Sequence, residues 1–194
     1  MWHKNGGMAP SRSIRTRPPL DSRRLEDLAL RYVGRYATSR AKLVGYLSRK
    51  VRERGWGADS EPDFDALANR FSELGYVDDA AFALAKSQSL TGRGYGKRRL
   101  EERLRLAGIG DEDGSAAREH ADANAVDAAI RFAERRRIGP YGASDGDPRT
   151  RERSLAAMVR AGHSFNLARV IVDWPADRSV EQQEIADRAG LTLS

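Results

Sequence analysis

A short helical sequence pattern occurs three times in this chain, and it constrains the fold more than any other feature. Each copy begins with basic residues, continues through an anchoring leucine with an apolar residue four positions later, and ends at a glycine. The anchoring residues are Leu43, Leu100 and Leu155, which lie about 55 residues apart. That spacing accommodates roughly three short helices per unit, so it predicts an array of small helical units. An array exposes a long outer surface, which favours binding over catalysis.

The hydrophobic periodicity predicts an all-α fold of three tandem three-helix repeats, because apolar residues recur three and four positions apart and no segment has the pattern of a strand. Each unit is too short to bury a sufficient core alone, so the units are expected to pack on their neighbours. The predicted boundaries are a disordered basic leader over 1–24, repeats over 25–75, 76–123 and 124–175, and a loose polar tail over 176–194.

Capping residues predict where several helices begin and end. Thr38 or Ser39 can cap the helix that carries Leu43, and Asp63 and Asp78 can cap the next two helices. Gly108 followed by Ile109 predicts a Schellman stop. The glycines of the turn between the second repeat's first two helices predict a flexible connection, and the buried helical faces are predicted to include Tyr36, Leu74, Phe165 and Trp174.

Composition excludes several classes of protein. The chain has no cysteine, so disulfides and thiolate metal sites are excluded, and no apolar run approaches the roughly 18 residues of a spanning helix. A cytosolic monomer is the default prediction. The net charge is +6, but residues 1–24 hold six basic side chains and one acidic side chain, so most of the excess lies in the leader. The leader either attracts phosphates or an acidic protein surface, or serves only as a solubilising segment.

The sequence offers no catalytic, cofactor or metal site. The turn Gly92–Lys97 lacks the glycine and the Ser or Thr that a phosphate-binding loop requires, since Thr91 and Arg98 occupy those positions. His3, His120 and His163 are far apart in the sequence and are expected to be surface or capping side chains. No Gly-x-Ser-x-Gly element presents a serine nucleophile.

Basic residues recur with the repeat, which predicts a continuous cationic face if the units stack with similar orientation. The alternative is an ordinary solvated surface on which neighbouring acidic side chains such as Glu101 and Glu102 neutralise the cations. The candidate partner-binding residues are Tyr95, Lys97, Arg98, Arg99 and Arg103 in the second repeat, Arg40, Lys42 and Arg49 in the first, and Arg151 and Arg153 in the third.

Two stretches of the sequence resemble the middle repeat of the bacterial RecX family of regulatory proteins. They are Leu74-Gly75-Tyr76-Val77-Asp78-Asp79 with Phe82-Ala83, and Gly94-Tyr95-Gly96-Lys97-Arg98-Arg99-Leu100 with Leu104 to Ile109. The resemblance extends over about 25–174. It departs from the family at Lys97, where many members have proline, in the length of the first repeat's second helix, and in the basic leader.

The resemblance implies an elongated, curved body of three three-helix units that binds the RecA nucleoprotein filament. It also implies a non-enzymatic regulator of homologous recombination, DNA repair and the SOS response, which inhibits the ATPase, strand-exchange and co-protease activities of RecA. The alternative is a sequence-tolerant DNA-binding protein of stacked helix-turn-helix-like units, because the chain is basic and helical. A scaffold for another protein also remains open, because the residues alone do not identify RecA.

Overall fold

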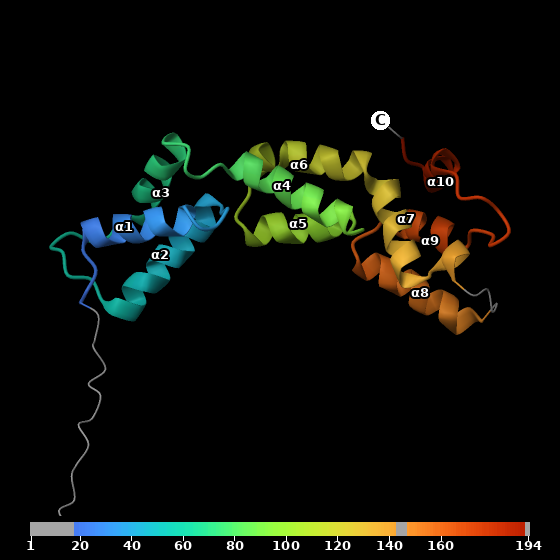
Figure 1. The fold of residues 1–194 in the computed structure, drawn as a ribbon, viewed down its shortest axis with the longest axis horizontal. Coiled ribbons are helices and arrows are strands. Elements are labelled where there is room, and N and C mark those ends of the chain that lie inside the picture. Colours follow the sequence, from blue (N-terminus) through green and yellow to red (C-terminus); the bar gives the residue numbers. More distant parts are fainter. Residues whose placement is uncertain (1–17, 143–146, 193–194) are drawn as a thin grey trace, which may run out of the picture.

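The computed structural model describes residues 18–142 and 147–192, and within these ranges the chain is all-helical. Ten α-helices and one 3₁₀ helix lie in the described ranges, and they fall into three groups along the longest axis of the molecule (Figure 1). The only extended pairing in these ranges is a single bridge between Leu20 and Trp56. The prediction of an all-α fold is confirmed.

The first group contains α1 (Ser22–Val33), α2 (Arg40–Arg54) and α3 (Phe64–Glu73). The amphipathic faces of these helices bury one hydrophobic cluster, in which Leu43, Leu47 and Phe71 are almost fully inaccessible to solvent. Ser39 and Asp63 cap α2 and α3 as expected, because each side chain accepts a hydrogen bond from the backbone N–H three residues later. Tyr36 and Leu74, which were expected on buried faces, are exposed because α1 ends at Val33 and α3 ends at Glu73.

The second group contains α4 (Asp79–Gly92), α5 (Lys97–Leu106) and α6 (Asp111–Ala123) around a separate cluster that includes Leu90, Leu100 and Leu104. Asp78 caps α4 by accepting a hydrogen bond from the Ala81 N–H. The Schellman stop of α5 is confirmed, because the Ile109 N–H donates to the Leu104 carbonyl at 3.0 Å.

The third group contains α7 (Ala125–Arg136), the 3₁₀ helix η1 (Gly139–Tyr141), α8 (Pro148–Arg160), α9 (Phe165–Val172) and α10 (Gln182–Ala189). Trp174 is buried in the cluster of this group as predicted, whereas Phe165 at the first position of α9 is exposed. The loose tail predicted over 176–194 is wrong for α10, which buries Ile185, Ala186 and Ala189 against that cluster. The apolar pattern of this helix is weak in the sequence, because polar and charged residues separate its few apolar side chains. Residues 193–194 lie outside the described part of the chain.

The leader predicted to be disordered is ordered where the structure describes it. Leu20 is fully buried, and its backbone N–H donates to the Gly55 carbonyl while its own carbonyl accepts from the Gly57 N–H. Asp21 then caps α1, which begins three residues earlier than the apolar pattern indicated. The remaining leader residues, 1–17, lie outside the described residues.

The glycine turn between α4 and α5 packs tightly against the third group, so the prediction of a flexible connection is wrong. The Gly96 N–H donates to the Ala161 carbonyl at 3.0 Å, and the Arg98 N–H donates to the Gly162 carbonyl at 3.1 Å. A Cβ atom at Gly96 would lie 2.3 Å from the Gly162 carbonyl oxygen. Glycine is therefore needed here for close backbone approach, which was indistinguishable in the sequence from a need for flexibility.

His163 lies at the same junction and is 2% exposed, which corrects the expectation of a surface or capping side chain. Its Nε2 atom is 3.1 Å from the Gly94 carbonyl oxygen, so the neutral ring donates from Nε2. Burial lowers the pKa of His163 from 6.5 to about 4, and the hydrogen bond to Gly94 opposes that shift. The imidazole is therefore neutral at physiological pH and links the second and third helix groups.

Candidate functional site

The first and second helix groups meet at the amino-terminal end of α2. The Ser39 hydroxyl donates to the Ala107 carbonyl at the end of α5 at 2.6 Å, and both residues are buried. The Arg40 N–H donates to the Asp79 carboxylate at the start of α4 at 2.8 Å. These contacts hold the first turn of α2 against α4 and α5, which places the Lys42 side chain beside the Phe82 ring of α4.

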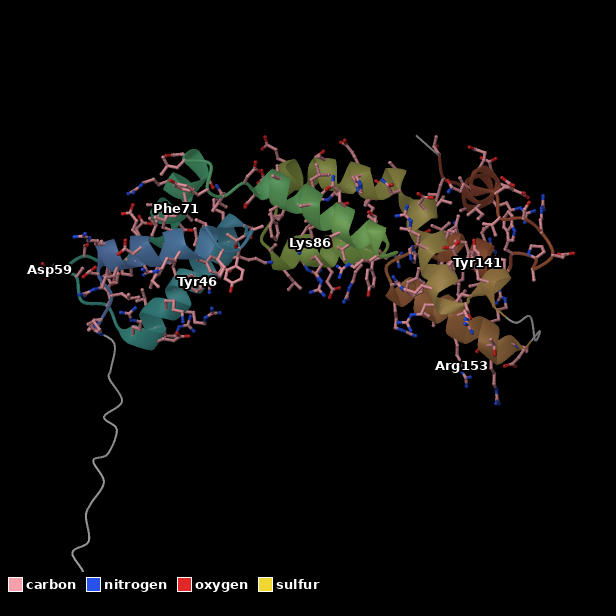
Figure 2. All side chains as sticks on the ribbon, in the orientation of Figure 1. Tyr46, Asp59, Phe71, Lys86, Tyr141 and Arg153 are labelled. Carbon is pink, nitrogen blue, oxygen red and sulfur yellow. The ribbon has the colours of Figure 1, made fainter. Side chains whose placement is uncertain are left out.

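This junction creates a hollow of about 400 Å³ that we call the cationic cleft. Five of its eight lining residues are basic, and none is acidic. The cleft is lined by Lys42, Lys86, Leu90, Arg93, Tyr95, Arg99, Arg103 and Leu106. Figure 2 labels Lys86 on α4, and it shows side-chain nitrogens projecting from the edge of the molecule formed by α2, α5 and α8.

The cations of the cleft lie close together, and two of them lie over the Phe82 ring of α4. The Nζ atoms of Lys42 and Lys86 lie 4.8 and 5.4 Å from the centre of the Phe82 ring. Partial burial lowers the pKa of Lys42, and the neighbouring charges of Lys86 and Arg103 lower it further. In the described part of the chain, no acidic side chain forms an ion pair with Lys42, Lys86 or Arg103. An anion entering the cleft would therefore relieve repulsion between cations that are already held in place.

Another part of the cleft is lined by the Tyr95 ring and the Arg93 guanidinium. The guanidinium carbon of Arg93 lies 5.6 Å from the centre of the Tyr95 ring, and Arg135 of α7 lies 5.9 Å from it. Arg99 pairs with Glu102 at 2.7 Å, so this one cation of the cleft is partly neutralised within α5. The arrangement can bind carboxylates or phosphates, because guanidinium groups form two parallel hydrogen bonds with either anion.

The structure brings together four of the predicted contact residues: Lys42, Tyr95, Arg99 and Arg103 all line the cationic cleft. Lys97 and Arg98 instead line a mostly apolar hollow beside Gly162 and His163, and Lys97 pairs with Asp122 at 2.5 Å. The α-helical geometry explains the separation, since consecutive residues point about 100° apart around the axis.

The remaining predicted contacts lie outside the cleft. Arg40 is exposed beside Asn69, and Arg49 lines a different hollow between α1 and α2. Arg151 forms a bidentate ion pair with Asp173 at 2.6 and 2.7 Å, which gives it a partner within the third group. Arg153 is exposed, and its side chain extends away from α8 (Figure 2). Whether these residues contact a partner stays a prediction.

Two cations of the cleft, Lys86 and Arg93, were missing from the predicted set. They lie on one face of α4 with Leu90 between them, at positions i, i+4 and i+7. That spacing was visible in the sequence. The contribution of α4 was missed because Lys86 is isolated from the basic runs that marked the other candidates.

The described residues also bear on two other features, a metal site and a membrane-spanning helix. Among residues 18–142 and 147–192, no group of three or more His, Cys, Asp or Glu side chains is placed to hold a metal ion. In the same ranges no helix combines the length and the apolar character required to cross a bilayer.

Known proteins resemble this chain over most of its length, although no protein-family model matches it. A regulatory protein RecX of Myxococcus xanthus is 33% identical over 159 residues, which covers 77% of this chain and 84% of that protein. The chain belongs to the RecX family.

Other RecX relatives have comparable similarity. Regulatory protein RecX of Mycobacteroides abscessus is 30% identical over 158 residues, which covers 81% of this chain and 75% of that protein. The protein of the same name from Thermobifida fusca is 33% identical over 159 residues, covering 78% of this chain and 82% of its own length. The similarity to RecX proteins thus covers most of the chain, and these relatives are named regulatory proteins.

Proposed function

We propose that this RecX-family chain is a non-enzymatic regulator that binds the RecA nucleoprotein filament and inhibits its ATPase, strand-exchange and co-protease activities. The observation that carries the proposal is the cationic cleft, in which Lys42, Lys86 and Arg103 are held without an acidic partner among the described residues. Family membership supports a regulatory role, and the cleft supplies a surface that fits acidic side chains of a protein partner.

The three helix groups act as tandem repeats in this proposal, over 25–75, 76–123 and 124–175, with Ser22 to Arg24 and α10 as extensions at the ends. Two equivalent junctions support this division. At the first junction, the hydroxyl of Ser39, the N-cap of α2, donates a hydrogen bond to the C-cap carbonyl of α5. At the second, the backbone N–H of Gly96, the N-cap of α5, donates a hydrogen bond to the C-cap carbonyl of α8. The carboxyl end of one helix thus faces the amino end of another twice, which also aligns their dipoles favourably.

Specific contacts between the helix groups suit a protein that must contact several subunits of a filament at once. Each contact is weak alone, but contacts at fixed spacing raise the effective concentration of the next one. In this proposal, a monomer held along the filament in this way slows filament growth or ATP turnover. The proposed contact surface extends beyond the cleft to Arg40 and Arg153, and to Arg49 and Arg151, which are paired with Glu53 and Asp173.

A RecA ATPase assay on single-stranded DNA tests the proposal directly. Increasing amounts of the chain are expected to lower ATP turnover. The double substitution Lys42→Glu with Arg103→Glu should raise the concentration for half-inhibition by about tenfold or more, because it reverses two charges that face the partner. Both side chains are exposed on the helix surface, so the fold should survive the change.

The matched control is Arg160→Glu with Arg169→Glu in the third group. Both arginines are exposed, and neither forms an ion pair in the described part of the chain. This control changes the net charge by the same amount but leaves the cleft intact, so inhibition should change by about twofold or less. Equal losses of inhibition in the two variants would show that only net charge matters and would refute the role of the cleft.

A further inference from the structure

Three tyrosine rings line a second hollow, which is separate from the cationic cleft and lies between α1 and α2. The rings of Tyr32 and Tyr46 stack with centres 4.1 Å apart and planes 11° apart. Tyr36 continues the series, with its ring centre 5.4 Å from that of Tyr32, and it is 53% exposed. The hollow has a volume of about 580 Å³, and Figure 2 labels Tyr46 beside it. We call it the tyrosine hollow.

Cations surround these rings. Arg31, Arg35 and Arg49 line the tyrosine hollow, and no acidic residue does. The Arg49 guanidinium and the Lys50 ammonium lie 5.7 and 5.8 Å from the centre of the Tyr46 ring. Glu53 is the nearby acid, and it forms ion pairs with Lys50 at 2.6 Å and with Arg49 at 3.6 Å. Within residues 18–142 and 147–192, neither Arg31 nor Arg35 forms an ion pair.

Tyr32 and Tyr46 pack against the core of the first helix group, whereas Tyr36 is not part of that packing. Tyr36 lies beyond the last residue of α1, so the helix does not force its ring to join the series, and more than half of its surface remains accessible. Tyr36 extends the stacked pair of Tyr32 and Tyr46 into one aromatic surface, and a contiguous exposed surface marks an interaction site where a single exposed ring would not. The core of this group is instead formed by Leu25, Ala29, Leu43, Leu47 and Phe71.

We propose that the tyrosine hollow binds single-stranded nucleic acid. An unpaired base stacks on the exposed Tyr36 ring, and Arg31 and Arg35 contact the phosphates on either side of it. A duplex keeps its bases stacked on one another, so it offers the hollow only phosphates. An acidic peptide would pair with the arginines, but its carboxylates would not stack on the tyrosine rings. The proposal does not depend on RecA, because the hollow is complete in this chain alone.

Fluorescence anisotropy of a labelled oligothymidine strand, measured with the full chain and without RecA, tests this inference. Tyr36→Ala is expected to weaken binding by roughly five- to tenfold, because it removes one stacking surface, whereas Tyr36→Phe should bind like the unchanged chain. The matched control is Tyr76→Ala, since Tyr76 is also 53% exposed but packs on Phe71. All variants keep residues 1–17, so any binding by that basic segment is common to them.

Two further measurements separate stacking from general attraction of phosphates. Arg31→Gln with Arg35→Gln should reduce the slope of log affinity against log salt by about 1.4, because two phosphate contacts are lost. Photochemical cross-linking of a 5-iodouracil strand should label Tyr36, Tyr32 or Tyr46. The inference is overturned if a matched duplex binds as tightly as the single strand, if Tyr36→Ala and Tyr76→Ala bind alike, or if the label falls elsewhere.

Discussion

Gly96→Ala is expected to lower the free energy of unfolding by about 3 kcal/mol, because it forces apart two backbones that touch. The added Cβ atom would lie 2.3 Å from the Gly162 carbonyl oxygen and 2.6 Å from the His163 nitrogen. These are main-chain atoms, so they cannot rotate away as a side chain would. The backbone of Gly96 is otherwise compatible with alanine, since its φ is −84°, and the loss therefore measures the close approach itself.

The control for this substitution is Gly92→Ala in the same connection. Gly92 is the last residue of α4, and a Cβ atom there would meet nothing within 4 Å. Alanine should stabilise the chain at this position by about 0.5 kcal/mol, because it restricts the unfolded state. Urea denaturation followed by circular dichroism and by tryptophan fluorescence gives both values. A Gly96→Ala variant as stable as Gly92→Ala would show that the second and third helix groups are not in contact.

Acidification is expected to remove about 3 kcal/mol of stability through His163 alone, since one pKa unit corresponds to about 1.4 kcal/mol. Burial lowers the pKa of this imidazole to about 4 in the folded chain, from 6.5 when unfolded. Between these values the unfolded state binds more protons than the folded state, so stability rises with pH through this window. The contribution is fully present above pH 6.5 and is lost as the pH falls to about 4.

Unfolding free energies measured between pH 4 and pH 7 check this prediction. The variant His163→Gln keeps a side-chain donor for the Gly94 carbonyl but has no titrating ring, so its stability should fall by about 3 kcal/mol less over the same range. The variant His120→Gln serves as the control, because it removes a histidine but leaves the His163 ring and its contact with Gly94 in place. Parallel pH profiles for all three proteins would contradict the buried, neutral state of His163.

The helix boundaries were predictable where a local interaction decides them. Ser39, Asp63 and Asp78 cap helices through contacts with their own following turn, so the sequence within four residues contains the required information. The same holds for the Schellman stop at Gly108 and Ile109. Periodicity likewise predicted the central residues of the helices that it identified, where several apolar side chains share one face.

The errors occur where the deciding partner is distant in the sequence. Gly96 packs on Gly162, His163 bonds to Gly94, and Leu20 pairs with Trp56, so none of these partners lies in the same local segment. A glycine required for close packing and one required for flexibility look the same in a sequence. The helix α10 was missed for a related reason, since its buried residues Ile185 and Ala186 find their partners in the third hydrophobic cluster.

The candidate site was predictable in part. The recurrence of basic residues selected Lys42, Arg99 and Arg103, which the structure places around one hollow, but it did not indicate which cations share that hollow. That outcome depends on the packing of α2 against α4, which brings Lys86 into the cleft and leaves Lys97 and Arg98 beside α9. The position of a basic residue in the sequence therefore did not predict whether its side chain lines the cleft, because helix packing decides that.

An electron cryo-microscopy reconstruction of this chain bound to a RecA filament on single-stranded DNA tests most directly whether the cationic cleft binds RecA. We expect one chain to contact more than one RecA subunit, with the cationic cleft facing RecA and with Lys42 and Arg103 within about 3 Å of carboxylate oxygens. A reconstruction in which the cleft faces solvent, or in which the chain contacts a single subunit through another surface, would contradict this expectation.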